Sequence, residues 1–156
     1  MPLLSLAMVT IDVHDLANHA GADLGRSTER EITQERVDLF ADATDDHQWI
    51  HVDPERARTG PFGRTVAHGY LTLSLVPSLL FECLQVTGAR LSVNYGVNRV
   101  RFPAPVPVGE RVRLAARIND VKPVEGGHQL VIGFELAVVG AEKPSAVGEV
   151  LYNFYH

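Results

Sequence analysis

Cysteine and basic charge are both scarce in this chain of 156 residues. The single cysteine, Cys83, cannot form an internal disulfide, which excludes a disulfide-stapled secreted scaffold. The 14 basic residues are outnumbered by 19 acidic ones, and the net charge of −5 disfavours nucleic acid as a partner. Hydrophobic residues at 46% and charged residues at 21% match ordinary globular proteins, which excludes a disordered tail or a collagen-like fibre. The length predicts one domain over residues 1–156.

Signals for export or membrane insertion are also missing. The segment 1–9 is apolar but has no basic residue ahead of it, so we expect a tail or a short packed segment rather than a secretory signal. The longest apolar stretch, 69–86, is interrupted by Pro77, Glu82 and Gln85, which argues against a membrane-spanning helix. The sequence therefore predicts a cytoplasmic protein with no membrane partner.

Two segments have apolar residues at helical spacing. The first, 33–43, opens on Thr33, a natural N-cap, and is apolar on one face. The second, 69–84, is apolar on every side, which predicts a buried helix that Pro77 should kink. Between them, 44–63 is polar and contains Pro and Gly, and is predicted to be a loop.

The chain after Arg90 predicts β-strands. Alternation places four apolar side chains of the first strand on one face: Leu91, Val93, Tyr95 and Val97. The apolar residues then change from odd-numbered to even-numbered positions, which indicates a bulge near Asn98 and Arg99. Three further alternating runs follow at 112–118, 130–138 and 146–154, and their short connections predict an antiparallel meander.

One buried helix and a long antiparallel sheet make an α+β fold, and the plain solution is a sheet curled around the helix. Such a sheet has an edge strand that must be covered. Pairing of two copies would cover it, so we expect a homodimer.

The most unusual segment is 45–57, where imidazoles and carboxylates lie beside apolar residues. One interpretation is a solvated loop held to the core by those apolar residues. A second is a metal site, because His47 and His51 stand four residues apart and Asp53 could be a third ligand. The zinc-protease pattern has a Glu where this chain has Gln48, so the sequence predicts no metal.

The third interpretation is a carboxylate–imidazole pair formed by Asp46 and His51. Histidine has an unperturbed pKa of about 6.5, so it can give or take a proton near neutral pH. A neighbouring Asp can orient the imidazole or share one water molecule with it. Five residues separate the two side chains, which suits a tight loop that folds back. Such a pair is suited to the addition or removal of water.

These residues also resemble those of a known family, the MaoC-like (R)-specific enoyl-CoA hydratases. The resemblance spans roughly residues 30–110. It is carried, in order along the chain, by Asp46, His51, Asp53-Pro54, Ala57, Gly60-Pro61-Phe62, Val66-Ala67-His68-Gly69, Asn94-Tyr95-Gly96 and the Pro-rich region from Arg101 to Gly109. The resemblance implies a hotdog fold, in which a sheet wraps a central helix. The commonest family motif, Gly-Asp-x-Asn-Pro-x-His, is altered here by Asp45, Gln48 and Trp49.

The resemblance implies reversible hydration of trans-2-enoyl-CoA to (R)-3-hydroxyacyl-CoA. It places one water between Asp46 and His51, and it places the N–H of Gly69, at a helix N-terminus, against the thioester oxygen. Five residues are expected to bind the substrate: Gln48, Ser74, Asn94, Tyr95 and Arg99. His68 is expected to support the helix start without a chemical role. No phosphate-binding loop is visible, so we expect no cofactor besides the CoA or acyl carrier protein that delivers the acyl group.

Two other functions remain open on the same fold. The altered Gln48 and Trp49 would suit a non-catalytic module that binds acyl thioesters. A hotdog acyl-CoA thioesterase is the other alternative. The sequence does not decide which of Asp46 and His51 takes the proton.

Overall fold

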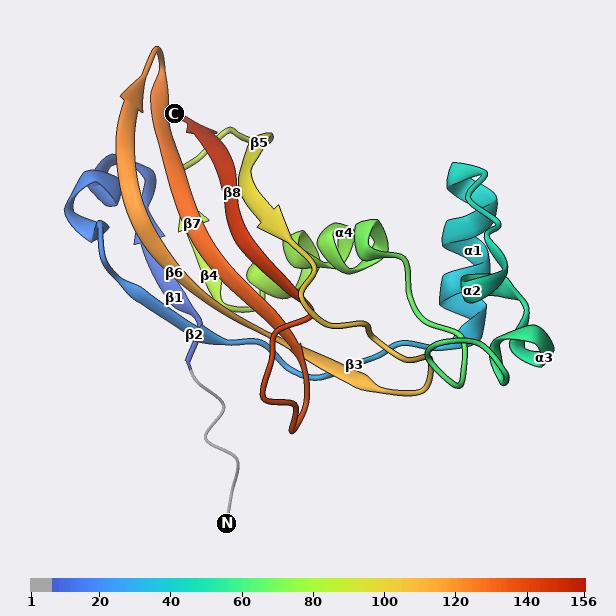
Figure 1. Cartoon of the computed structure of the whole chain (residues 1–156). Helices are drawn as coiled ribbons and strands as arrows, with labels where there is room; N and C mark the ends of the chain where they lie inside the picture. The colour runs from blue at the N-terminus through green and yellow to red at the C-terminus, as the bar shows by residue number, and fades with distance from the viewer. Residues whose placement is uncertain (1–6) are drawn as a thin grey trace.

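The computed structural model describes residues 7–156 as a long curved sheet with one helix packed against it (Figure 1). The six-stranded sheet has the order β2-β6-β7-β8-β5, and the short strand β3 also pairs with β6. Its strands are β2 (Asp23–Arg26), β3 (Arg30–Glu31), β5 (Leu91–Arg101), β6 (Arg111–Val124), β7 (Gly127–Val138) and β8 (Ala146–Tyr155). Helix α4 (Gly69–Leu80) lies against this sheet and contributes to the same hydrophobic core.

The predicted meander is confirmed for the last three strands and wrong for β5. Strands β6, β7 and β8 are consecutive antiparallel neighbours, whereas β5 pairs with β8 and forms the edge of the sheet. The Pro-rich segment 102–110 carries the chain from one side of the sheet to the other. On the way it pairs with 65–67, where the Ala67 N–H donates to the Val106 carbonyl at 2.8 Å. This crossing connection fixes the chain that leads into α4.

Strand β5 contains the expected bulge and a second one that the sequence analysis missed. The register shifts between Asn98 and Arg101, and Arg99 has a left-handed backbone with φ of 52°. It also shifts between Asn94 and Gly96, where Tyr95 is the extra residue. Before this bulge, Ser92 and Asn94 lie opposite the core residues Phe154 and Tyr152; after it, Val97 lies opposite the core residue Val150.

The second bulge corrects the prediction that Leu91, Val93, Tyr95 and Val97 share one face. Side chains of paired residues lie on the same face of a sheet, so Val97 shares the inner face with Ser92 and Asn94. Leu91 and Val93 lie on the opposite face. Both of them, and Tyr95, are exposed in the single chain.

Helix α4 is shorter and less completely buried than predicted. Its buried face is made by Leu71, Thr72, Leu75, Val76, Leu79 and Leu80. On the other side Tyr70 is 70% exposed and Ser74 is also exposed. The helix ends at Leu80, because the Glu82 and Cys83 N–H groups donate three residues back, to the Leu79 and Leu80 carbonyls, and the chain turns into β4 (Leu84–Thr87).

The N-terminal elements were not predicted from the sequence. Strand β1 (Val9–Asp12) pairs in parallel with β4, and a 3-10 helix, η1 (Val13–His19), follows it. The predicted tail or packed segment over 1–9 lies largely outside the described residues, and Val9 is the first residue of β1. No helix within residues 7–156 is long and apolar enough to cross a membrane.

The helix predicted over 33–43 is confirmed as α1 (Gln34–Thr44). The Arg36 N–H donates to the Thr33 hydroxyl at 3.1 Å, which is the predicted N-cap. The loop predicted over 44–63 is partly wrong, because it contains two single-turn helices, α2 (Trp49–Val52) and α3 (Pro54–Ala57). Figure 1 shows α1, α2 and α3 grouped beside the N-terminal end of α4.

Candidate active site

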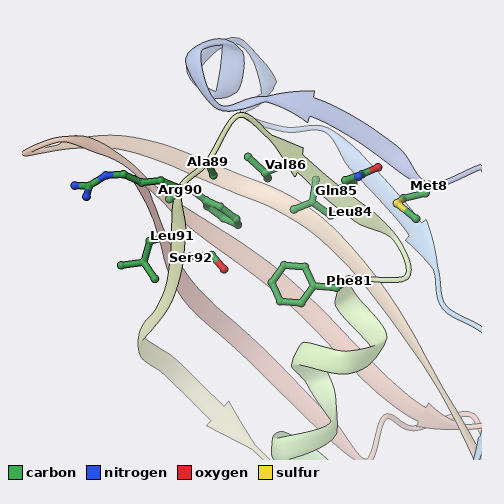
Figure 2. Close-up of a pocket in the computed structure, with 10 residues that line it drawn as sticks. Met8, Phe81, Leu84, Gln85, Val86, Ala89, Arg90, Leu91 and Ser92 are labelled. Carbon is green, nitrogen blue, oxygen red and sulfur yellow. The ribbon is translucent and has the colours of Figure 1, made fainter. Parts of the chain in front are cut away.

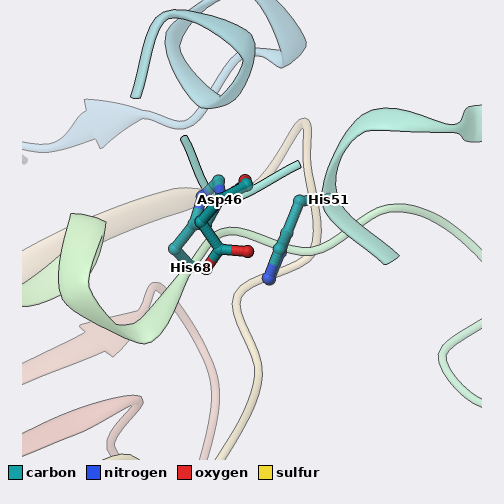
Figure 3. A group of neighbouring side chains, drawn as sticks. All are labelled: Asp46, His51 and His68. Atoms are coloured by element: carbon teal, nitrogen blue, oxygen red, sulfur yellow. The ribbon is translucent and has the colours of Figure 1, made fainter. Parts of the chain in front are cut away.

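Three polar side chains meet where α1, α2 and α4 come together: Asp46, His51 and His68. Asp46 follows the end of α1, His51 lies in α2, and His68 is the N-cap of α4. One oxygen or nitrogen atom of each lies within 4.8 Å of those of the other two. Asp46 is exposed, whereas both imidazoles are buried (Figure 3). Figure 3 also shows the Asp46 carboxylate turned toward the His51 ring.

His51 is held by hydrogen bonds at its ring and at its main chain. Its ring Nδ1 lies 2.7 Å from the Val66 carbonyl, and because a carbonyl only accepts, Nδ1 carries the hydrogen. The main-chain oxygen of His51 accepts from the Gln34 side-chain amide at 2.8 Å, and the Thr65 hydroxyl donates to the same amide group at 2.6 Å. The lone pair of His51 is therefore on Nε2, free for chemistry.

The pKa of His51 lies below the ordinary value of 6.5. Burial is the main cause, because it penalises the charged imidazolium, and nearby His68 lowers the pKa further. The Val66 carbonyl and the Asp46 carboxylate act in the opposite direction without cancelling this effect. His51 is thus a neutral base at neutral pH.

The placement of Asp46 depends on a left-handed turn at the end of α1. Asp45, the C-cap, has φ of 60°, a conformation that favours Gly and that Asp tolerates better than most residues. It is the position where the commonest family motif has Gly. The Asp46 carboxylate accepts from the Gln48 N–H at 3.5 Å, a long contact.

Gly69 opens α4 and directly follows His68. Within residues 7–156, neither the Gly69 nor the Tyr70 N–H donates a hydrogen bond, as is usual for the first turn of a helix. A Cβ at Gly69 would lie 2.9 Å from Cδ2 of Phe102. Packing of Phe102 is therefore a reason for glycine here, in addition to the close approach of a ligand that the sequence predicts.

Three predicted substrate-binding residues line one cavity of about 300 Å³: Ser74, Asn94 and Tyr95. Its walls also include Leu73 and Pro77 of α4, one to two turns beyond Gly69. The Ser74 hydroxyl donates to the Tyr70 carbonyl at 2.7 Å, so its hydrogen is already used within the helix.

The other two predicted substrate-binding residues are not brought to this cavity. Gln48 is exposed and caps α2 through its main chain, without a hydrogen bond from its side chain to the helix. Arg99 lies at the β5 bulge beside Glu149. The pKa of Glu149 is lowered mainly by hydrogen bonds from Asn98 and Asn119, and in smaller part by Arg99.

A larger cavity, of about 650 Å³, lies at the opposite end of α4 from the histidines (Figure 2). Phe81 at the end of the helix and Leu91 and Ser92 of β5 surround it. Its one charged lining residue is Arg90. This cavity offers apolar volume but no acid–base pair.

The three possible metal ligands considered from the sequence, His47, His51 and Asp53, do not gather around one point. His47 pairs with Asp42 at 2.8 Å, and Asp53 caps α3 by accepting from the Arg56 N–H at 3.0 Å. Asp46, His51 and His68 are closer to a ligand set. However, the two imidazoles are stacked, with an angle of 23° between their planes. A histidine nitrogen binds a metal in the plane of its ring, so one ion could be bound by both histidines only if the rings moved apart.

Sequence reasoning missed the role of three residues that hold the site together, Gln34, Thr65 and Val66, and expected His68 only to support the helix start. These three act through main-chain atoms or through partners far along the chain, which leaves no motif. His68 did leave a signal, as an imidazole immediately before the glycine that opens an apolar helix.

The model of the MaoC like domain family matches residues 15–139. The chain is 51% identical over 143 residues to "3-hydroxyacyl-thioester dehydratase Z" of Mycobacterium tuberculosis, which covers 91% of this chain and 95% of that protein. It is 41% identical over 133 residues to "Nodulation protein N" of Rhizobium leguminosarum bv. viciae, covering 84% of this chain and 82% of the relative.

Solved structures share the architecture. The (R)-hydratase from A. caviae, described as involved in PHA biosynthesis, superposes with a TM-score of 0.71 at 25% identity. The match covers 85% of this chain and 94% of the hydratase. The predicted hotdog arrangement, a sheet around a helix, is confirmed.

Proposed function

The chain belongs to the MaoC-like domain family, and we propose that it catalyses the reversible hydration of a trans-2-enoyl thioester to the (R)-3-hydroxyacyl thioester. The observation that carries the proposal is the meeting of Asp46 and His51 at the N-terminus of α4. Their polar atoms lie within 4.8 Å, a separation that one water can bridge with two hydrogen bonds of ordinary length.

His51 is proposed to be the base, because its Nε2 lone pair is free and its ring is neutral. In hydration, Nε2 takes a proton from the water as the oxygen bonds to C3 of the enoyl group. The imidazolium then returns a proton to C2, so that one water is added and no other reactant is consumed. Asp46 accepts a hydrogen bond from the water and stabilises the transient imidazolium.

The N–H of Gly69 is proposed to bind the thioester oxygen. Negative charge develops on this oxygen as C3 is attacked, and the first N–H groups of a helix carry the positive end of its dipole. Because Gly69 adjoins His68, this donor lies beside the acid–base pair. Removal of one such donor typically costs a factor of about 10²–10³ in rate.

The acyl tail is proposed to occupy the cavity lined by Ser74, Asn94 and Tyr95. The cavity has an apolar floor of Leu73, Pro77 and core side chains of β8, and it begins one turn beyond Gly69. CoA or an acyl carrier protein would then extend to solvent from the thioester. Gln48 and Arg99, which are both exposed, remain candidates for contacts with that carrier.

A second copy of the chain is proposed to cover the β5 edge. Leu91, Val93 and Tyr95 are 52%, 40% and 66% exposed on this edge, which is unpaired within the described chain. An apolar edge strand of this length promotes pairing with another strand. Two β5 strands related by a twofold axis would extend the sheet across a homodimer.

The test is the loss of enoyl absorbance when purified protein is mixed with crotonyl-CoA and longer trans-2-enoyl-CoA substrates. The parent protein should hydrate at least one of them, and Asp46→Asn and His51→Ala should each abolish the reaction while circular dichroism shows that both variants remain folded. Thermal shifts with acyl-CoA but no turnover would instead indicate a binding module. Release of free thiol would indicate a thioesterase.

A further inference from the structure

His68 contacts or adjoins every member of the proposed catalytic set. It is 2% exposed, and its Nε2 lies 2.9 Å from the main-chain oxygen of Asp46. Its ring stacks on that of His51, with the centroids 3.8 Å apart. It is also the N-cap of α4, one peptide bond before Gly69. Few side chains can reach an acid, a base and an oxyanion donor at once.

The hydrogen bond to Asp46 fixes a loop that has few other restraints. A carbonyl only accepts, so His68 Nε2 carries the hydrogen and donates it. Within residues 7–156, no other group donates to the main-chain oxygen of Asp46. The carboxylate itself receives only the long contact from the Gln48 N–H. His68 therefore determines where the Asp46 side chain is presented.

The stacking acts on His51. One face of the His51 ring is covered by His68, which keeps water from that face and holds the ring at one inclination. Phe40 packs against His68 in turn, with the ring centroids 4.9 Å apart, so the stack is backed by α1. The remaining His68 nitrogen, Nδ1, is buried and has no hydrogen-bond partner within the described chain. A buried polar atom without a partner is costly, and such exceptions concentrate at functional sites.

We infer that His68 is a positioning residue, which sets the distance between Asp46 and His51 and aligns both with the Gly69 N–H. This inference rests on the proposed hydratase function. His68 does not touch the reacting atoms; it acts through the two residues that do. A displacement of about 1 Å at a reacting centre can cost about 100-fold in rate, which gives the expected size of the effect.

Two substitutions separate the two contacts of His68. His68→Phe keeps a ring for the stack but removes the donor to Asp46, and should lower kcat about 100-fold with little change in KM. His68→Gln keeps a side-chain N–H at similar reach but removes the ring. It should recover at least tenfold of that loss. The matched control is His47→Gln, because His47 is an exposed neighbour of Asp46 that pairs with Asp42, and its kcat should stay within twofold of the parent.

A pH titration gives a second readout, one that reports on the contact between His68 and His51 directly. The pKa of the His51 ring, followed by NMR, should rise in His68→Gln, because the substitution removes the stacked ring that helps to bury His51. This measurement does not require turnover, so it tests the inference even if the parent proves inactive as a hydratase. Because it is made on His68→Gln, the titration also tests the inference if His68→Phe fails to fold.

Unchanged kcat in both variants, or an unchanged His51 titration in His68→Gln, would overturn the inference. An inactive parent whose His51 titration still responds to His68→Gln would refute the proposed reaction alone. The two failures are therefore distinguishable.

Discussion

At the scale of single residues, the proposed reaction depends on the protonation state of His51, because only the neutral ring can act as the base. Its pKa lies below 6.5 because the ring is buried, so the neutral base persists when a solvated histidine would be charged. We predict that kcat/KM for hydration is constant near neutral pH and falls tenfold per unit of pH below the His51 pKa, with the half-point under 6.5. A pH–rate profile checks this, with His47→Gln as the control that leaves the half-point unchanged. A half-point above 7 would contradict the assignment of His51 as the base.

The same residue makes stability depend on pH. The unfolded chain has the ordinary histidine pKa of about 6.5, whereas the folded pKa is lower. As the pH falls below about 6.5, the unfolded state gains the proton first, so the contribution of the neutral ring is lost between that value and the folded pKa. In His51→Gln the drop in melting temperature between pH 7 and 5 should be smaller than in the parent. An equal or larger drop in the variant would argue against this.

Sequence alone predicted that Asp46 and His51 come together, but not the residues that hold them there. Asp46 and His51 stand five residues apart in one polar segment, and that spacing is enough to suggest a loop that brings them together. The contacts from Val66, Gln34 and His68 come from other parts of the chain. They depend on how α1 and α4 are packed, which no local pattern specifies.

At the scale of elements, α1 is followed directly by the turn that holds Asp46, and it is capped by Thr33 at its N-terminal end. We predict that Thr33→Ala costs about 1 kcal/mol of unfolding free energy, because the Arg36 N–H loses its partner. Thr33→Ser keeps the hydroxyl and should cost less. Urea denaturation followed by circular dichroism measures both, and equal stability of Thr33→Ala and the parent would show that the cap contributes nothing.

Helix α4 is stabilised by its buried face. Leu79 is fully buried among core residues, and Leu79→Ala should cost about 2–5 kcal/mol through lost burial and the cavity left behind. Leu39→Ala is the matched control, because Leu39 is 63% exposed on α1 and should change stability by less than about 0.5 kcal/mol. Similar losses for the two variants in denaturant titrations would contradict the observed burial of α4.

Long periodic segments were predicted better than short ones. The helix at 34–44 and the three strands β6 to β8 have enough turns or alternations to be seen in the sequence. Strands β1 to β4 have two to four residues each, too few to show alternation. The position of β5 next to β8 follows from the crossing of the Pro-rich segment and from a bulge at Tyr95, which are both consequences of tertiary packing.

At the scale of the whole molecule, the β5 edge is expected to join two copies. The parent should therefore sediment as a species of twice the chain mass of 17.1 kDa. Val93→Lys places a charge on that edge and should shift the protein toward the monomer. Val139→Lys is the control, because Val139 is similarly exposed but lies beyond the end of β7. A monomeric parent, or a Val93→Lys variant that stays dimeric, would contradict the proposed interface.

The central claim is that this site adds water to one face of an enoyl thioester. The most direct measurement is chiral analysis of the product formed by the parent protein from trans-2-enoyl-CoA, with Asp46→Asn as the inactive reference. We predict a single product, (R)-3-hydroxyacyl-CoA, and no product above background from the variant. Formation of the (S) product, release of free CoA, or no reaction by the parent would contradict the account.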